Sequence, residues 1–281
     1  ALPPSAAFAF AVLTVSPLNW RRYCLSNQYQ LAGLTNFQRR EIEEKYVEWR
    51  TFFRVEHNIV NPAADGLLFD PTWLNILEDG FYEKAHKRHS RIVSHDDNNN
   101  PVYLISAHCG LLYRNNSGDF QPITASPAFN SHDHIELRPV SEGDYVLKQT
   151  HQRRILIPGI PEMYLYNTLN THPSVKSVRI YPGVDRYDLR VEFQDQTHAI
   201  DIKDHRRPYA LEKMLSSKMA LPRVDEHEID ELGYDVFLYL IPSARVQKYD
   251  DGLKKLKRLE RQHKNLFIMT VEQYLEELKR V

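Results

Sequence analysis

Charged and apolar residues alternate in two neighbouring segments of the C-terminal half. In residues 197–203 this alternation places Asp201 and Lys203 on one face of a predicted β-strand. Residues 187–193 alternate in the same way, with Asp188 among the charged positions. Carboxylates bind hard divalent cations, and a lysine beside them stabilises developing negative charge. The two segments therefore predict a divalent-metal centre suited to phosphodiester hydrolysis.

A third acid precedes these strands. Residues 160–162 open a predicted helix that runs to about residue 170, and Glu162 lies in its first turn. Glu162 is expected to complete the metal shell, while Lys203 orients the attacking water or neutralises charge on the phosphate. The candidate catalytic residues are thus Glu162, Asp188, Asp201 and Lys203, with the three acids as metal ligands. Mg²⁺ is the expected ion, and Mn²⁺ is expected to substitute for it.

The elements that must hold these side chains follow a mixed order. Strands are predicted at 175–181, 187–193, 197–203, 236–241 and 266–270. Helices are predicted at 160–170, 207–220, 248–264 and 271–280. Strands interrupted by helices in this way are typical of a mixed α/β architecture. We therefore expect an α/β domain over residues 151–281.

The N-terminal half is expected to be mainly helical up to residue 100. Residues 35–58 show amphipathic spacing, and Asp70-Pro71 is a typical helix start. Trp20, Trp49 and Trp73 are expected to fill the core of this region. After a polar run at 95–101, short strands predict a small β-rich segment over residues 101–150. These strands are expected at 102–105, 110–113 and 134–137.

Glu162 on a helix, Asp188 on a strand and Asp201-x-Lys203 on the next strand together resemble the PD-(D/E)xK nuclease superfamily. In that superfamily a helix supplies Glu, the second core strand supplies Asp, and the third supplies (D/E)-x-K. The resemblance covers about residues 155–270. It implies a restriction-endonuclease-like mixed sheet flanked by helices, and magnesium-dependent nuclease activity.

Residues 158–162, 181–190 and 200–204 resemble, more narrowly, the nuclease-like proteins encoded beside Piwi-like proteins in bacterial conflict systems. Such proteins often carry a zinc ribbon before the nuclease core. Residues 106–112 resemble one knuckle of a ribbon, with Ser106 in place of the first cysteine, and the sequence holds no second knuckle. A metal-free remnant is therefore expected. The resemblance also implies a part in antiviral defence and a Piwi-like or helicase partner.

The same acids also have ordinary structural explanations. The two strand aspartates would form ion pairs with Arg190 and Lys203, and such pairs are common and contribute little stability. Glu162 suits the first turn of any helix because of the helix dipole. Asp185 is an additional acid near the site, but the Pro-Gly pair before it favours a role in a turn. These alternatives stay open from the sequence alone.

Local basic clusters are the candidate nucleic-acid contacts, because the net charge of −1 provides no general attraction for phosphates. The candidate residues are Arg206, Arg207, Lys254, Lys255 and Arg258. The two arginines would equally well solvate the start of a helix. Leucines at positions 253, 256 and 259 would also make residues 248–264 a packed helix whose basic face is merely solvated.

Composition excludes several other classes of protein. Two cysteines, Cys24 and Cys109, rule out a disulfide framework or a cysteine-rich zinc finger and suit a reducing cytoplasm. His108, His132 and His134 do not combine with Cys109 in a spacing typical of zinc sites. The sequence contains no Gly-rich phosphate loop, so no bound nucleotide is expected. No membrane association is expected either, because the apolar run at 6–15 is too short to cross a bilayer.

The sequence therefore predicts a magnesium-dependent endonuclease, with DNA as the expected substrate and a protein partner in a defence complex. Two alternatives remain. One is a catalytically idle subunit of the same fold that docks a Piwi-like or helicase partner. The other is an effector that cleaves RNA.

Overall fold

In the computed structural model the chain forms two compact units, residues 1–124 with 131–159 and residues 125–130 with 160–281. The structure describes residues 35–53, 57, 59–78, 80–84, 94–95, 101–106, 112–114, 120–122, 135–139, 143–148, 151–204, 211, 213, 232–247, 253–254, 256–263 and 265–280. None of the described helices is long and apolar enough to cross a membrane.

The N-terminal unit contains both predicted helices. Helix α4 (Asn36–Phe52) ends six residues before residue 58, where the amphipathic spacing predicted the end of the helix. Helix α5 (Pro71–Glu78) begins at its proline, which is favoured at the first helical position. Trp73 on α5 is 4% exposed and lies 4.9 Å from the ring of Phe52, so its predicted place in the core is confirmed. The side chains of Trp20 and Trp49 lie outside the described part of the chain.

Short strands follow in this unit, as predicted. Strand β8 pairs antiparallel with β1 and β2, and β4 pairs antiparallel with β3 and β7. Strands β5 and β6 form a separate antiparallel pair. The bounds are β1 (Ile59–Val60), β2 (Tyr82–Lys84), β3 (Ser94–His95), β4 (Pro101–Ser106), β5 (Leu112–Arg114), β6 (Phe120–Pro122), β7 (Ile135–Pro139) and β8 (Tyr145–Leu147), with a 3-10 turn η2 (Leu67–Phe69). Residues 107–111 of the proposed zinc-ribbon remnant lie outside the described residues.

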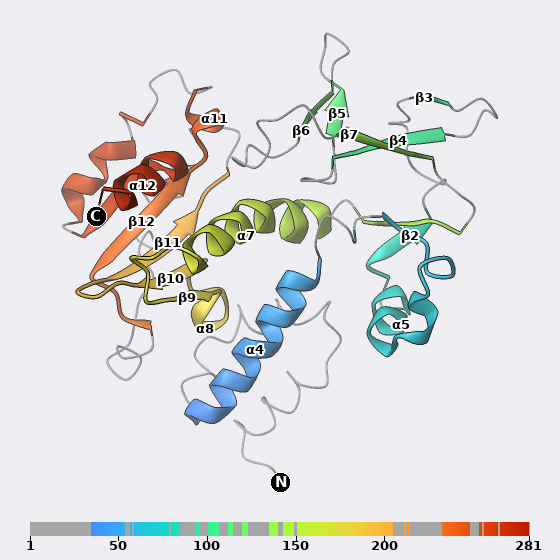
Figure 1. The fold of residues 1–281 in the computed structure, drawn as a ribbon, viewed down its shortest axis with the longest axis horizontal. Helices are drawn as coiled ribbons and strands as arrows, with labels where there is room; N and C mark the ends of the chain where they lie inside the picture. The colour runs from blue at the N-terminus through green and yellow to red at the C-terminus, as the bar shows by residue number, and fades with distance from the viewer. Residues whose placement is uncertain are drawn as a thin grey trace. The chain divides into compact units, whose positions relative to one another are not determined.

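The C-terminal unit is built on a five-stranded mixed sheet of order β13-β12-β11-β10-β9, drawn from yellow to red in Figure 1. Strands β9, β10 and β11 are antiparallel, whereas β11, β12 and β13 are parallel. The strands are β9 (Ser177–Ile180), β10 (Leu189–Glu192), β11 (Thr197–Ile202), β12 (Val236–Ile241) and β13 (Leu266–Thr270). The helices are α7 (Ile157–Asn170), α8 (Pro182–Asp185), α11 (Ser243–Val246) and α12 (Val271–Leu278), and a π-helical turn (Gln152–Leu156) precedes α7. The predicted α/β fold is confirmed.

Both faces of the central strands of this sheet are largely buried, although the alternation predicted half-buried strands. On one face Ala199, Phe237 and Tyr239 belong to a core cluster with Leu256 and Leu259. On the other face, His198 of β11 contacts the hydroxyl of Tyr274 on α12 at 3.1 Å. Parallel strands require crossover segments, and these segments cover the faces of the sheet. The charged residues of β10 and β11 therefore lie among packed side chains rather than on an open surface.

The helix predicted for residues 248–264 is wrong in the part of it that the structure describes. There the chain forms a turn at 253–254 and two 3-10 turns, Leu256–Arg258 and Glu260–Gln262. Leucines at 253, 256 and 259 recur every three residues, which is the period of a 3-10 helix rather than of an α-helix. Most of the predicted helix at 207–220 lies outside the described residues. Within that range the structure describes Leu211 and Lys213, and both are helical.

Candidate active site

Asp188 and Asp201 lie opposite each other at one end of the β10–β11 pair. The register pairs Leu189 with Ile200, and its continuation by one residue pairs Asp188 with Asp201. Residues directly opposite each other in an antiparallel pair share a face of the sheet. The backbone N–H of Ile202 donates to Oδ2 of Asp188 at 2.5 Å, which fixes this carboxylate at the end of β11. The structure thus brings together the two aspartates that the sequence pattern selected.

Lys203 lies beside this pair of acids. Its Nζ donates to Oδ1 of Asp201 at 2.5 Å and lies 5.8 Å from the ring centre of Tyr239. Burial lowers the pKa of Lys203, but the nearby carboxylates of Asp201 and Asp188 outweigh burial and raise the pKa above its ordinary value. The lysine is therefore a fixed positive charge at neutral pH, rather than a proton acceptor.

Glu162 comes to the same site from helix α7. Its side chain is 4% exposed, and its Oε2 accepts a hydrogen bond of 2.5 Å from the hydroxyl of Tyr181. Burial is the largest cause of a raised pKa at Asp188, and the negative charges of Glu162 and then Asp201 raise it further. The electrostatic influence of Glu162 on Asp188 indicates that the helix acid belongs with the strand acids.

Among the residues that the structure describes, the acids outnumber the cations around Asp188. Lys203 lowers the pKa of Asp188, whereas Glu162, Asp201 and Asp185 raise it. A buried carboxylate is costly unless an opposite charge compensates it. The cluster therefore has an excess of negative charge that an additional cation would relieve.

A strained turn connects β9 to β10 and carries Asp185. Tyr181, Gly183 and Asp185 have positive φ angles of 52°, 61° and 66°. The φ angle favours glycine at residue 183, and a Cβ atom there would lie 2.8 Å from Cδ1 of Leu232, so the end of that leucine side chain would have to move. Asp185 ends α8 in the turn that the sequence predicted, and its charge still acts on Asp188.

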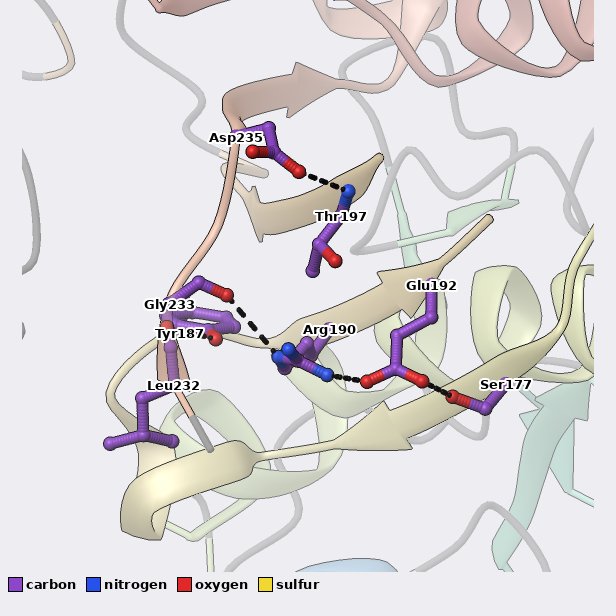
Figure 2. Close-up of polar contacts among 8 residues, drawn as sticks. All are labelled: Ser177, Tyr187, Arg190, Glu192, Thr197, Leu232, Gly233 and Asp235. Carbon is purple, nitrogen blue, oxygen red and sulfur yellow. Dashed lines mark hydrogen bonds and ion pairs between the residues drawn. The ribbon is translucent and has the colours of Figure 1, made fainter. Parts of the chain in front are cut away.

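The segment entering β12 is held against the sheet by polar contacts, which Figure 2 shows. The hydroxyl of Tyr187 donates to the carbonyl of Leu232 at 2.9 Å, and Oδ2 of Asp235 accepts from the Thr197 amide at 2.7 Å. Nε of Arg190 donates to the carbonyl of Gly233. These contacts fasten the segment across the strands that carry both aspartates.

Arg190 does not pair with Asp188, contrary to the ion-pair alternative considered from the sequence. Its guanidinium instead forms an ion pair with Glu192, which also accepts a 2.7 Å hydrogen bond from Ser177 on β9. The other expected pair, between Lys203 and Asp201, is present. The ordinary structural explanation therefore accounts for Asp201 but leaves Asp188 without its expected arginine.

Two side chains that the sequence pattern did not select also border the site. Tyr239 lies next to Asp201 in the parallel register of β12, and burial followed by the charge of Asp201 raises its pKa above the ordinary value. Arg245 donates from Nε to Oδ1 of Asp204 at 2.5 Å, and both side chains are 8% exposed. A tyrosine in a buried strand and an arginine 41 positions from its partner carry no local sequence signal. Tyr181 was predicted only as the last residue of the strand at 175–181, and nothing in the sequence pattern selected it for the site.

The candidate nucleic-acid contacts are only partly described. Lys254 and Arg258 are exposed on the segment whose Leu256 and Leu259 pack against the sheet face that carries Asp201. Arg206, Arg207 and Lys255 lie outside the described residues. The described cations are thus free to contact solvent, while their leucine neighbours anchor the segment.

The donor set at this site matches the chemistry of Mg²⁺, because Asp188, Asp201 and Glu162 offer only carboxylate oxygens. Within the described residues, however, no group of three or more acids, histidines or cysteines is arranged closely enough to hold a metal ion. Mg²⁺ commonly uses one or two carboxylates and keeps several waters. The facing aspartates, together with the excess negative charge around Asp188, therefore fit the ion, although the three described acids do not form a preformed cage.

In the comparison with known proteins, one family model matches the sequence of the C-terminal unit. Residues 159–281 match the model of a family described as "REase associating with pPIWI_RE". No curated protein and no solved structure matched the chain. The matched region includes Glu162, Asp188, Asp201 and Lys203 and covers somewhat less than half of the 281-residue chain. The resemblance predicted from the sequence is thus confirmed for residues 159–281, which are similar to the restriction-endonuclease-like family associated with pPIWI_RE.

Proposed function

We propose that this chain is a metal-dependent endonuclease that hydrolyses nucleic-acid phosphodiesters, with DNA as its substrate. The family match supports a nuclease-type domain. The observation that carries the proposal is the placement of Asp188 opposite Asp201, with Lys203 bonded to Asp201. Acidic residues alone would suit many sites, but two facing carboxylates beside a protonated lysine suit a reaction in which charge develops on a phosphate.

Each residue has a stated part in this proposal. Asp188 and Asp201 would hold Mg²⁺, or Mn²⁺ in its place, and Glu162 would complete the metal shell. When bound, the ion supplies an activated water and neutralises charge on the phosphate. Lys203 remains protonated because of the neighbouring carboxylates, so it would offer a positive charge to the phosphate oxygens.

The substrate would be gripped by cations outside the carboxylate cluster. Lys254 and Arg258 are exposed on a segment anchored over the sheet face of Asp201, so they can reach a phosphate backbone without losing a core contact. Arg206, Arg207 and Lys255 are proposed as further contacts from their positions in the sequence. A chain of net charge −1 needs such local patches to bind nucleic acid.

We further propose that the chain works with a protein partner in the cytoplasm, as part of defence against invading nucleic acid. The description of the matched family names an association with pPIWI_RE. A Piwi-like partner would then select the target and bring it to this nuclease.

The test is a cleavage assay of the full chain on plasmid, single-stranded DNA and RNA, with Mg²⁺, Mn²⁺ or EDTA. The proposal predicts cutting of DNA that requires a divalent ion and stops in EDTA. Cleavage of RNA alone would replace DNA with RNA as the substrate. Cleavage that persists in EDTA would contradict the metal-dependent mechanism.

One observation favours a second function, that of a catalytically idle docking subunit. Among the described residues no three metal-binding side chains are grouped, and Lys203 neutralises Asp201 directly. An idle subunit would bind its partner but bind no Mn²⁺ and cut no nucleic acid. Calorimetric titration of the full chain with Mn²⁺ separates the two functions, because only the enzyme is expected to release heat of binding.

A further inference from the structure

Tyr181 contacts two separate parts of the carboxylate site at once. Its hydroxyl donates to Oε2 of Glu162 on helix α7 at 2.5 Å. Its backbone N–H donates to the carbonyl of Asp188, at the start of β10, at 2.8 Å. Helix and strand are thus joined through a single residue, which is itself fully buried.

The backbone of Tyr181 adopts a conformation that a tyrosine rarely takes. Its φ of 52° and ψ of 46° lie in the left-handed region, which is unfavourable for a side chain of this size. Such a conformation persists only where the surroundings hold it in place, and it is often found at functional sites. Here it lets the residue direct its amide toward Asp188 and its ring toward Glu162.

Glu162 differs from the two strand acids in the group that holds its carboxylate, because it accepts a hydrogen bond from the side chain of Tyr181. Asp188 accepts from a backbone amide and Asp201 accepts from Lys203, so both are fixed by β11 and the residue that follows it. Glu162 comes from a helix, and a rotation of its side chain would carry the charge away from Asp188. The tyrosine hydrogen bond restricts that rotation.

We propose that Tyr181 is a positioning residue of the carboxylate site, which sets divalent-cation affinity by holding Glu162 beside Asp188. This inference rests on the proposed function of the same site. Residues that hydrogen-bond to metal-binding carboxylates fix their orientation, and their loss commonly weakens metal binding. Tyr181 touches neither the phosphate nor the ion, and it acts only through Glu162.

The experiment compares Tyr181→Phe with Tyr187→Phe. Tyr187 is a matched control, because it is also buried, belongs to the same stretch of chain, and donates its hydroxyl to a backbone carbonyl rather than to an acid. Mn²⁺ affinity is measured by calorimetry on the full chain without nucleic acid. Tyr181→Phe is expected to weaken Mn²⁺ binding by roughly 10- to 100-fold. Tyr187→Phe is expected to stay within about twofold of the wild type.

A double-mutant cycle with Glu162→Gln tests whether Tyr181 acts through this acid. In the Glu162→Gln background, Tyr181→Phe is expected to weaken Mn²⁺ binding by no more than about twofold further. An unchanged Mn²⁺ affinity in Tyr181→Phe, or an equal loss in both backgrounds, would overturn the inference while leaving the nuclease proposal intact. Failure of Tyr181→Phe to fold would also overturn it, by showing a structural residue. A wild-type chain that neither binds Mn²⁺ nor cleaves nucleic acid would overturn both.

Discussion

The buried ion pair between Arg245 and Asp204 offers a sharp test of how the end of β11 is held. Arg245 follows β12 on α11, Asp204 follows Lys203, and the two side chains are 8% exposed. Replacing Arg245 with Met keeps most of the side-chain volume but removes this cation from the buried Asp204. Removal of one partner from such a pair typically costs about 3–5 kcal/mol. We therefore expect Arg245→Met to lower the unfolding free energy of the C-terminal unit by about that amount.

A surface pair provides the control for this experiment. Arg280 and Glu276 lie 3.9 Å apart on α12 and the turn after it, with side chains 77% and 69% exposed. Arg280→Met is expected to change stability by no more than about 0.5 kcal/mol, because solvent screens such pairs. The double variant Asp204→Asn with Arg245→Met should lose less stability than Arg245→Met alone, because the buried carboxylate charge is removed together with the cation.

The assay must follow the C-terminal unit specifically. The three tryptophans, at positions 20, 49 and 73, all fall in the sequence range of the other unit, so none is a probe within the C-terminal unit. Hydrogen exchange of the amides in β11 and β12 measures the opening free energy of this unit directly. The reasoning is refuted if Arg245→Met costs no more than Arg280→Met, or if the double variant costs the full sum of its two single changes.

Three further predictions concern other parts of the C-terminal unit. Gly183→Ala should lower the unfolding free energy by about 1–3 kcal/mol, because residue 183 has a positive φ and its new Cβ atom would press on Leu232. The loss should be smaller in a variant that also carries Leu232→Ala. Hydrogen exchange measures both effects. Burial lowers the pKa of His198 to about 4, against the opposing charge of a nearby acid, so its stabilising contribution is present above pH 6.5 and is lost as pH falls from 6.5 toward 4. The stability of the wild type should therefore fall more steeply than that of His198→Gln over this range, by at most about 1.4 kcal/mol per pH unit, and parallel profiles would contradict the prediction. Replacing Lys254 and Arg258 with Gln should flatten the salt dependence of DNA binding by about 0.9 log unit per log unit of salt for each lost phosphate contact, whereas an unchanged slope would remove both residues from the interface.

Local patterns in the sequence were enough to predict the sheet. Strands β12 and β13 have the predicted bounds because each is a short, mainly apolar run. Helix α12 begins at the predicted residue, where Thr270 and Gln273 form a capping box. The alternation in β10 and β11 likewise predicted that Asp188 and Asp201 would share a face, because a strand has a period of two residues.

Other features depend on contacts that no local pattern encodes. The pairing of Arg245 with Asp204 joins residues 41 positions apart, and the bond from Tyr181 to Glu162 requires a left-handed tyrosine. In the described part of residues 248–264 the helix prediction failed, because leucines at three-residue steps follow the 3-10 period, and their packing against the sheet goes with the tighter helix.

The most direct test of the central claim is single-turnover cleavage of a plasmid by the wild type, Asp201→Asn and Lys203→Met, with Mg²⁺ present. The account predicts divalent-dependent cutting by the wild type and a loss of roughly 100-fold or more in Lys203→Met, because the lysine charge would stabilise the phosphate during reaction. Asp201→Asn should be similarly impaired, and its Mn²⁺ binding should weaken. A wild-type chain that cuts equally well in EDTA, or a Lys203→Met variant that cuts at the wild-type rate, would contradict the account.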